Sequence, residues 1–223
     1  MSGASQWSCI LWDMDGTIVD ASEGILQRLQ VTFDHLGKPA PTHDDLIKWI
    51  GPPMQESFQH NANLTPEEAL RTVEFYRSLH DYDDLAAGVR IYPGVAELIN
   101  EVAAAGVAQA IASSKPEAQV VPLAEHFGIS PDFVAMVGGS DDGVTRVSKA
   151  DVVREALRRL AEAGVDTSRP VLIGDRRHDI EGGAECGVPV IHVTWGFSYP
   201  GEGDGAIATA TTTAELRDLI LTA

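Results

Sequence analysis

An apolar run, residues 9–12, leads directly into the segment 13–17, which reads Asp-Met-Asp-Gly-Thr. A short apolar run bounded by turn residues is typical of a strand buried on both faces, as in a parallel sheet. Asp13 would then lie at or just past the carboxyl end of that strand, where open α/β sheets bind their ligands. Because Asp13 and Asp15 are close enough to repel each other, at least one of them needs a cation or a raised pKa. An ordinary Asp-Gly turn beside a solvated aspartate is the alternative, and this segment alone does not exclude it.

The part of the chain from Tyr92 onward alternates between apolar runs and helical patterns. Strands alternating with helices indicate an α/β fold, a Rossmann-like doubly wound parallel sheet with helices on both faces. The apolar runs predict strands at 107–112, 133–137, 170–173 and 188–193, the last of these being the final strand. Helices are expected between the strands, most strongly at 149–163, and again at 213–221.

Residues 20–87, which follow the first motif, have a helical pattern with no clear strand. Thr65 and Pro66 form a typical helix start, with a side-chain cap and a proline at the first helical position. A helical block inserted after a strand predicts an all-helical cap, a lid that excludes water when it closes. The boundaries would be 1–19 and 88–223 for the α/β core and 20–87 for the cap. The alternative is that these helices pack on the sheet as an ordinary layer.

The chain is strongly acidic, with a formal charge of −17 and a pI near 4.6. This charge argues against nucleic acid or an anionic membrane as the main partner, and a phosphorylated substrate would need a local concentration of positive charge. Cys9 and Cys186 are the only cysteines, so a disulfide framework is not expected. The chain has no apolar stretch of membrane-spanning length and no pattern typical of a signal peptide. We therefore expect a soluble cytoplasmic protein, either a monomer or a small homo-oligomer.

Polar residues follow the second strand of the predicted core. Ser113 and Ser114 come directly after it, where hydroxyls and backbone amides at a helix start can bind phosphate. Lys149 begins the long helix, where the helix dipole does not favour a cation, so an anionic neighbour is expected. Lys115 is the competing candidate for neutralising the phosphate and ranks second. Taken singly, each serine is compatible with an ordinary helix cap and each lysine with a solvated surface position.

The predicted strand at 170–173 ends in Gly174-Asp175, and Asp179 is spaced to fold back beside Asp175. Together with Asp13 and Asp15, these residues would place four carboxylates at one edge of the sheet. Such a cluster is costly unless a cation neutralises part of it, and an all-oxygen ligand set suits Mg²⁺. An imidazole is a poor ligand for Mg²⁺, so His178 is expected at the surface or facing the cap.

These motifs resemble the four motifs of the haloacid-dehalogenase-like (HAD) hydrolase superfamily, whose members are mostly Mg²⁺-dependent phosphatases. The resemblance covers nearly the whole chain and is greatest for the phosphoglycolate-phosphatase-like group with a helical cap. Segments 51–58, 92–95 and 114–117 are also similar to that group. Ser113, where threonine is commoner, is a mild departure.

The resemblance implies a role for each motif residue. Asp13 would be the nucleophile that forms an aspartyl-phosphate, and Asp15 the general acid and base. The implied metal ligands are the side chains of Asp13, Asp175 and Asp179 (the last directly or through water) and the backbone carbonyl of Asp15. The implied phosphate-binding residues are Ser113, Ser114, Lys149, Gly16 and Thr17. Thr17 is also expected to order the loop after the nucleophile.

The expected function is Mg²⁺-dependent hydrolysis of a small phosphorylated metabolite, namely phosphoglycolate, a nucleoside monophosphate or a sugar phosphate. A sugar-phosphate mutase of the β-phosphoglucomutase type shares every motif and is the enzymatic alternative. A phospho-accepting receiver module is the non-enzymatic alternative, but it lacks an acid in the position of Asp15 and lacks a helical insertion. Dehalogenases of the superfamily also lack this second acid. Arg71, Arg77 and Arg90 are candidates for contacting a carboxylate or second phosphate on the substrate, although exposed helix arginines are usually solvated.

Overall fold

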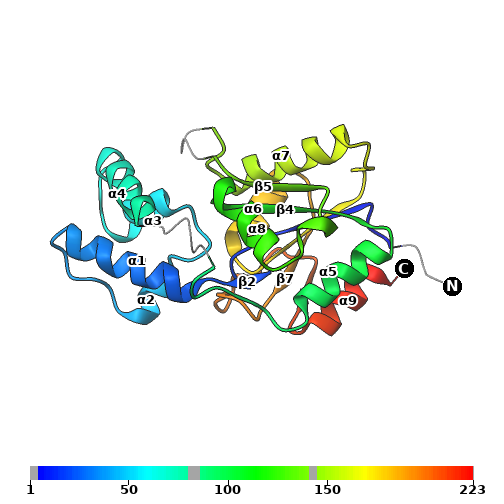
Figure 1. Cartoon of the computed structure of the whole chain (residues 1–223), viewed down its shortest axis with the longest axis horizontal. Helices are drawn as coiled ribbons and strands as arrows, with labels where there is room; N and C mark the ends of the chain where they lie inside the picture. The colour runs from blue at the N-terminus through cyan, green and yellow to red at the C-terminus, as the bar shows by residue number, and fades with distance from the viewer. Residues whose placement is uncertain (1–4, 80–85, 141–144, 223) are drawn as a thin grey trace.

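A six-stranded parallel sheet forms the body of the molecule (Figure 1). The computed structural model describes residues 5–79, 86–140 and 145–222. The strands lie in the order β5-β4-β1-β6-β7-β8. They are β1 (Cys9–Trp12), β4 (Ala108–Pro116), β5 (Ala135–Gly139), β6 (Pro170–Gly174), β7 (Val190–Val193) and β8 (Ala208–Ala210). The predicted α/β class with a parallel sheet is confirmed.

Helices cover both faces of this sheet. They are α5 (Val95–Ala104), α6 (Glu117–His126), α7 (Lys149–Glu162), α8 (Arg177–Glu185) and α9 (Thr213–Leu221), with a 3₁₀ turn at Ser130–Asp132. Alternate residues of a strand point to opposite faces. Ile10 and Trp12 of β1 accordingly pack in one hydrophobic cluster with α5, α6 and α9. Cys9 and Leu11 pack in a second cluster with α7 and α8.

The prediction that the strand at 188–193 is the last one was wrong, because the edge strand β8 follows it. β8 pairs in parallel with β7, with Ile191 opposite Ala208. Its three residues, Ala-Thr-Ala, contain no apolar run, so nothing in the local sequence distinguishes them from a loop.

Strand β4 is longer than predicted, and this changes the setting of the two serines. It continues through Pro116, and its pairing with β5 shifts between Ala112 and Pro116. Gly138 allows this close approach, because a Cβ there would lie 2.4 Å from the backbone nitrogen of Glu117. Ser113 and Ser114 therefore lie within the irregular end of a strand, and the expectation that they begin a helix was wrong.

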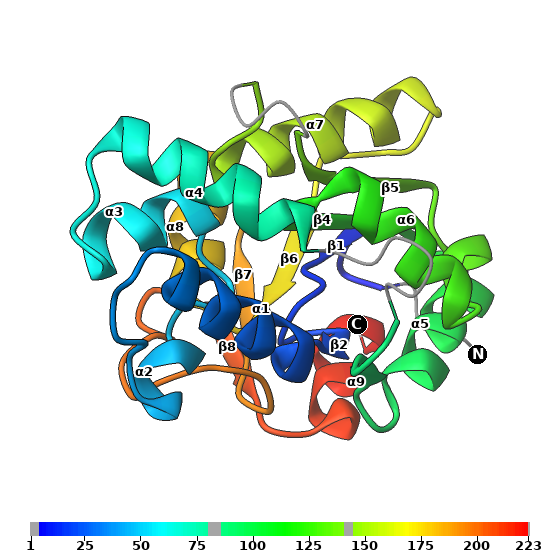
Figure 2. The same ribbon diagram turned by 60° about the vertical axis from the view of Figure 1, so that its left-hand side comes forward.

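In the described part of the chain, four helices lie between residues 20 and 90 and pack around a hydrophobic cluster that also includes Phe197 (Figure 2). These are α1 (Ser22–His35), α2 (His43–Ile47), α3 (Met54–Asn61) and α4 (Pro66–Ser78), here called the helical insertion. Trp49 contacts both Phe33 and Phe58 edge to face, with ring centroids 5.4 and 5.0 Å apart. As the sequence suggested, Thr65 caps α4 and forms a capping box with Glu68.

A short antiparallel ribbon connects the helical insertion to the sheet. Strand β2 (Val19–Asp20) pairs with β3 (Arg90–Ile91), with Val19 opposite Ile91 and Asp20 opposite Arg90. The chain thus enters and leaves the helical insertion at adjacent points. Within the described ranges, no helix combines the length and the apolar character needed to cross a membrane.

Candidate active site

The site is built at the carboxyl ends of three neighbouring strands, β4, β1 and β6. Trp12, the last residue of β1, pairs with Ile111 of β4 and with Ile173 of β6. The backbone N–H of Asp13 donates to the carbonyl of Ile173 over 2.9 Å. Motifs separated by more than a hundred residues therefore meet at one edge of the sheet, as open α/β folds require.

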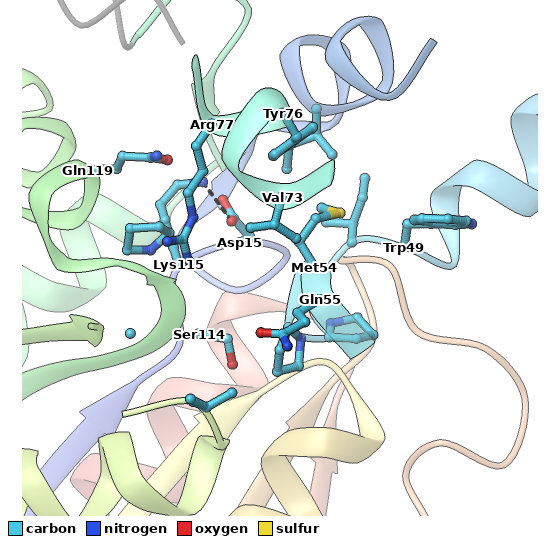
Figure 3. A pocket seen from close by; sticks show the side chains of 18 of the residues that line it. Asp15, Trp49, Met54, Gln55, Val73, Tyr76, Arg77, Ser114, Lys115 and Gln119 are labelled. Atoms are coloured by element: carbon cyan, nitrogen blue, oxygen red, sulfur yellow. Dashed lines mark hydrogen bonds and ion pairs between the residues drawn. The ribbon is translucent and has the colours of Figure 1, made fainter. Parts of the chain in front are cut away.

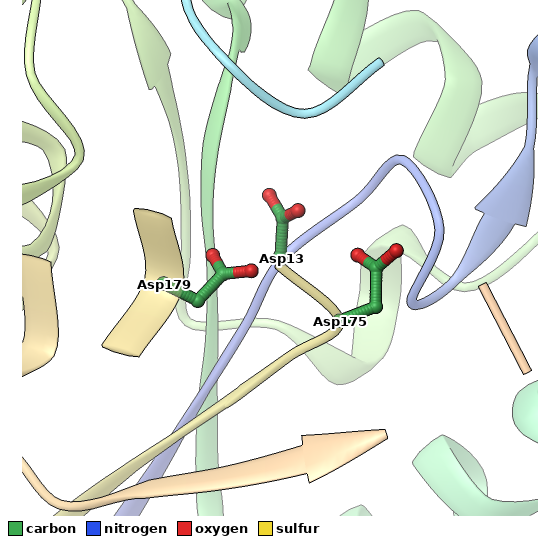
Figure 4. A group of neighbouring side chains, drawn as sticks. All are labelled: Asp13, Asp175 and Asp179. Carbon is green, nitrogen blue, oxygen red and sulfur yellow. The ribbon is translucent and has the colours of Figure 1, made fainter. Parts of the chain in front are cut away.

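Three carboxylates converge at this edge (Figure 4). One oxygen from each of Asp13, Asp175 and Asp179 lies within 4.8 Å of the others. The exposed fractions of these residues are only 4, 0 and 2%. The carboxylate of Asp15 lies outside this group. The structure thus brings together three of the four predicted acids. The fourth, Asp15, pairs with Lys115 instead.

The electrostatics of the group are unfavourable when all three acids are ionised. Burial raises the pKa of Asp13, and the charge of Asp179 adds to this, while Lys149 opposes it. Burial also raises the pKa of Asp175 well above its usual value, with further contributions from Asp179 and Asp13. A bound cation would remove this repulsion, and oxygen ligands of this kind are the ones that Mg²⁺ prefers.

Lys149 supplies one positive charge to the group. Its Nζ lies 2.7 Å from Oδ1 of Asp13 and 2.6 Å from Oδ1 of Asp179. Burial lowers the pKa of Lys149, but the two carboxylates outweigh this and hold it above its ordinary value. The anionic neighbour expected from the position of Lys149 at the start of α7 is therefore present, and Ser148 caps that helix in a capping box.

The second candidate lysine contacts a different acid. Nζ of Lys115 lies 2.8 Å from Oδ2 of Asp15, and both side chains are nearly buried. The other carboxylate oxygen of Asp15, Oδ1, is buried and has no hydrogen-bond partner in the described part of the chain. The same holds for the hydroxyl of Ser114. These two atoms are therefore available to a group that enters the site.

The loop after Asp13 is held against Asp175. Gly16 has a φ of +86°, and a Cβ at this position would lie 2.2 Å from Oδ2 of Asp175, so only glycine fits. The hydroxyl of Thr17, which is fully buried, donates to Oδ1 of Asp175 over 3.4 Å. This contact links the loop after Asp13 to Asp175.

Two residues of the loop after β7 support Asp175 and the loop that holds it, and neither was predicted from the sequence. The backbone N–H of Phe197 donates to Oδ2 of Asp175 over 2.7 Å, and the indole of Trp195 donates to the carbonyl of Thr17 over 3.1 Å. No side-chain pattern could have identified a backbone donor such as that of Phe197. Trp195 lies two residues after the end of β7, and its place near a strand end was an available signal.

Arg176, next to Asp175, connects the site to the helical insertion. Its buried guanidinium forms two hydrogen bonds with Glu202, at 2.7 and 3.0 Å, and another with the backbone carbonyl of Ile50. The side chain packs so closely on Gly51 that a Cβ there would lie 2.7 Å from Cγ of Arg176. His178 also faces the insertion, with Nε2 3.7 Å from a carboxylate oxygen of Glu56 on α3.

Comparison with known proteins agrees with this geometry. The family model described as "Haloacid dehalogenase-like hydrolase" matches residues 10–193, which is most of the chain. The chain belongs to the haloacid dehalogenase-like hydrolase family. The resemblance inferred from the motifs is therefore confirmed.

Several curated proteins are similar over most of the chain. The tyrosine-protein kinase PtkA of Mycobacterium tuberculosis is 34% identical over 204 residues, which cover 91% of this chain and 66% of PtkA. The chain thus spans slightly less than two thirds of the length of PtkA. A 5'-nucleotidase of Pseudomonas aeruginosa is 32% identical (89% of this chain, 88% of the relative). A phosphoglycolate phosphatase of Agrobacterium fabrum is 28% identical (84% and 81%).

Solved structures of the HAD-like family agree with the fold. A predicted phosphatase from Clostridium acetobutylicum superposes with a TM-score of 0.87 at 28% identity, covering 95% of this chain and 97% of that one.

This HAD-like hydrolase has a cavity between the helical insertion and the sheet edge (Figure 3). Trp49, Met54 and Tyr76 line it from the insertion, and Asp15 and Lys115 line it from the core. Ser114 also lines it, whereas Asp13, Ser113 and Lys149 are not among its lining residues. Of the four predicted acids, only Asp15 lines the cavity.

The three arginines considered for substrate contact lie in different surroundings. Arg77 lines the cavity (Figure 3). Arg71 is exposed and pairs with Glu67 on its own helix, at 3.0 Å. Arg90 is exposed and lies 3.6 Å from Glu23. Of these three arginines, only Arg77 lines the cavity.

Proposed function

We propose that this HAD-like hydrolase is a Mg²⁺-dependent phosphatase that hydrolyses a small phosphate monoester through an aspartyl-phosphate intermediate. The observation that carries the proposal is the position of Asp13. Its carboxylate lies at the end of the central strand, 2.7 Å from the ammonium of Lys149 and within 4.8 Å of Asp175 and Asp179. A phosphoryl group that reaches this point would meet a nucleophile and the charges needed to neutralise its oxygens.

The residues present fit a magnesium ion. Asp13, Asp175 and Asp179 provide carboxylate oxygens in a buried group whose mutual repulsion favours a cation, and the backbone carbonyl of Asp15 completes the proposed ligand set. When bound, Mg²⁺ would neutralise charge on the phosphoryl oxygens. We assign no ligand role to His178, because it faces Glu56.

The chemical step follows from the two aspartates of the first motif. A carboxylate oxygen of Asp13 attacks phosphorus and forms a new P–O bond, while the bond to the leaving oxygen breaks with its electron pair. Asp15 donates a proton to that oxygen. It then accepts a proton from the water that attacks the aspartyl-phosphate, which releases inorganic phosphate and restores Asp13.

Positive charge and hydrogen-bond donors would stabilise the transferring group. Lys149 neutralises the nucleophile and the phosphoryl oxygens, and the Ser113 and Ser114 hydroxyls and the loop at Gly16 contribute donors. Lys115 takes a different role in this proposal. It contacts Oδ2 of Asp15 at 2.8 Å and so orients this side chain, which leaves the other oxygen, Oδ1, to carry the proton for the leaving oxygen.

The helical insertion would act as the cap, with the domain boundaries proposed from the sequence: residues 20–87 for the cap, and 1–19 with 88–223 for the core. Its separate hydrophobic cluster, the β2–β3 ribbon and the cavity beneath it support this role. A cap in this position would exclude water from the site and contact the leaving group of the substrate.

The direct test is a panel of phosphorylated metabolites assayed for phosphate release, with Mg²⁺ and then with EDTA. We expect hydrolysis of at least one of phosphoglycolate, a nucleoside monophosphate and a sugar phosphate, and loss of it in EDTA. Conversion of glucose 1-phosphate without phosphate release would instead indicate a mutase. Turnover that is unchanged in EDTA would contradict the metal requirement.

A further inference from the structure

The cavity beneath the helical insertion has a charge opposite to that of the protein. Among the described residues that line it, four are cationic and one, Asp15, is acidic. The chain as a whole carries a formal charge of −17. A positive cleft in an acidic protein concentrates anions from solution. The lining cations are Arg28, Arg77, Lys115 and Arg146.

Two of these cations already have acidic partners within the protein. Lys115 pairs with Asp15 at 2.8 Å, and Arg146 pairs with Glu117 at 2.9 Å. Arg28 differs from them, because it forms no ion pair in the described part of the chain. Its Nε is buried and has no hydrogen-bond partner there. Its positive charge is therefore not neutralised by a neighbouring side chain.

The surroundings of Arg28 hold the guanidinium in place. It lies over the ring of Tyr76, 5.5 Å from the ring centroid. The backbone of Gly24 also approaches closely, since a Cβ there would lie 3.2 Å from Nη1 of Arg28. An arginine side chain that is already packed in this way loses little conformational entropy when it binds an anion. A buried Nε–H without a hydrogen-bond partner costs free energy, which a bound anion would recover.

The position of Arg28 relative to the acids indicates which part of a substrate it would meet. It lines the cavity together with Lys115 and Gln119, and the same three residues border a smaller neighbouring cavity. Asp15 also lines the main cavity, whereas Asp13 and Lys149 do not. Because Asp15 is the proposed proton donor to the leaving oxygen, the cavity is where the leaving group would lie.

We infer that Arg28, with the amide of Gln119 beside it, binds a second anionic group on the leaving-group side of the substrate. This inference rests on the proposed phosphatase function. The second group is a carboxylate or a second phosphate, because a guanidinium binds both in the same planar geometry. The substrate class is then a small phosphate ester or anhydride with two anionic ends, and esters with an uncharged leaving group are poorer substrates.

Matched substrates and two variants test the assignment. Phosphoglycolate carries the carboxylate, pyrophosphate carries the second phosphate, and 2-hydroxyethyl phosphate has the carbon frame of phosphoglycolate without the second charge. The Arg28→Gln variant removes the cation. The Arg71→Gln variant is the control, because Arg71 is exposed, pairs with Glu67 and does not line the cavity.

We expect the wild type to prefer one of the two doubly anionic substrates over 2-hydroxyethyl phosphate. For that substrate, Arg28→Gln should raise KM by about tenfold to a hundredfold, the loss typical of a charge-assisted hydrogen bond. Turnover of 2-hydroxyethyl phosphate should change by less than about twofold, a difference too small to reflect a lost charged contact. The preferred substrate distinguishes a carboxylate site from a phosphate site. Equal losses on charged and uncharged substrates would overturn the inference, and so would a wild type without preference.

Binding measurements separate this inference from the proposed activity. Phosphonoacetate, methylenediphosphonate and ethylphosphonate mimic the three kinds of substrate with bonds that a phosphatase does not cleave. We expect titration calorimetry with Mg²⁺ to show tighter binding of one doubly anionic phosphonate than of ethylphosphonate, and loss of that difference in Arg28→Gln. If no phosphate ester is hydrolysed but this difference is found, the proposed function fails and the anion site stands. If esters are hydrolysed and the difference is absent, the anion site fails alone.

Discussion

Lys115 and Asp15 form a nearly buried ion pair, with Nζ 2.8 Å from Oδ2, across 100 positions of the chain. Lys149 makes the corresponding contact with Asp13, at 2.7 Å. The two lysines that the sequence offered as competitors for one role therefore contact two different acids. Their different contacts predict different kinetic consequences when each lysine is removed.

We expect Lys149→Met to lower kcat/KM by more than about a hundredfold for every phosphate ester, because it removes charge from the transferring group itself. Lys115→Met should lower it more for an alkyl phosphate than for para-nitrophenyl phosphate, whose leaving oxygen needs little protonation. Steady-state kinetics with both substrates check this. The same dependence on leaving group in both variants would contradict the division of roles.

Asp13→Asn should abolish hydrolysis of para-nitrophenyl phosphate, with a loss of more than about a thousandfold, since an amide is a poor nucleophile. Its melting temperature should stay within about 3 °C of wild type, because the change preserves shape and removes a poorly solvated charge. Thermal unfolding alongside the assay separates lost chemistry from lost folding. Retained turnover in a folded variant would rule out Asp13 as the nucleophile.

Gly16→Ala should weaken the metal site more than it weakens the fold. The new methyl group would meet the carboxylate of Asp175 and add to the strain of a positive φ. Gly164→Ala is a matched control, since Gly164 has a φ of +81° and nothing within 4 Å of an added Cβ. The control should lose only about 1–2 kcal/mol of unfolding free energy, the cost of the backbone conformation. Gly16→Ala should in addition lose its stabilisation by Mg²⁺, measured as the shift in melting temperature. An unchanged shift would contradict the steric contact.

Stability of the metal-free protein should depend on pH through Asp13 and Asp175, whose folded-state pKa values are raised by burial. At low pH these carboxyls are protonated in the folded and the unfolded states, so the folded state does not bear the cost of a buried charge. As pH rises through their raised pKa values the folded protein must ionise them while buried, so stability is lost. Mg²⁺ binds the ionised form, and its stabilising effect should therefore be larger near pH 8 than near pH 5. Melting curves with Mg²⁺ or EDTA at both pH values test this, and an equal Mg²⁺ effect would refute it.

Arg176→Gln should destabilise the protein, because Glu202 would remain partly buried without its cation and the carbonyl of Ile50 would lose a donor. Breaking a buried ion pair in this way typically costs about 3–5 kcal/mol. Arg177→Gln, at the exposed neighbouring position, is the control and should change unfolding by less than about 0.5 kcal/mol. Denaturant unfolding of the two variants provides the comparison. Equal free energies of unfolding for the two variants would show that neither the pair with Glu202 nor the contact with Ile50 stabilises the protein.

The convergence of Asp13 and Asp175 was predictable from the sequence, because each follows a buried apolar strand and parallel strands end at one edge. Asp179 was predictable from its spacing at the start of the next helix. The positions of these acids depend on the local apolar pattern, which can be read from the sequence, and on crossover connections that are almost always right-handed.

Features that depend on packing between distant segments were not predictable. The extension of β4 depends on Gly138 in the neighbouring strand, whose missing side chain allows the backbones to approach. The pairing of Lys115 with Asp15 and the place of Arg28 in the cavity depend on side-chain conformations at the contact between insertion and sheet. Strand β8 depends on its pairing with β7 and on packing against α9, since its own residues carry no strand pattern.

The ribbon of β2 and β3 has a consequence for how such an enzyme can change its substrate. The two segments that connect the helical insertion to the core are paired with each other, with Val19 opposite Ile91. The insertion is therefore joined covalently to the core at one place. A helical insertion of different length can replace this one without altering the alignment of the strands. Under the proposed cap role, new specificities would arise by replacing this module while the reaction itself is inherited unchanged.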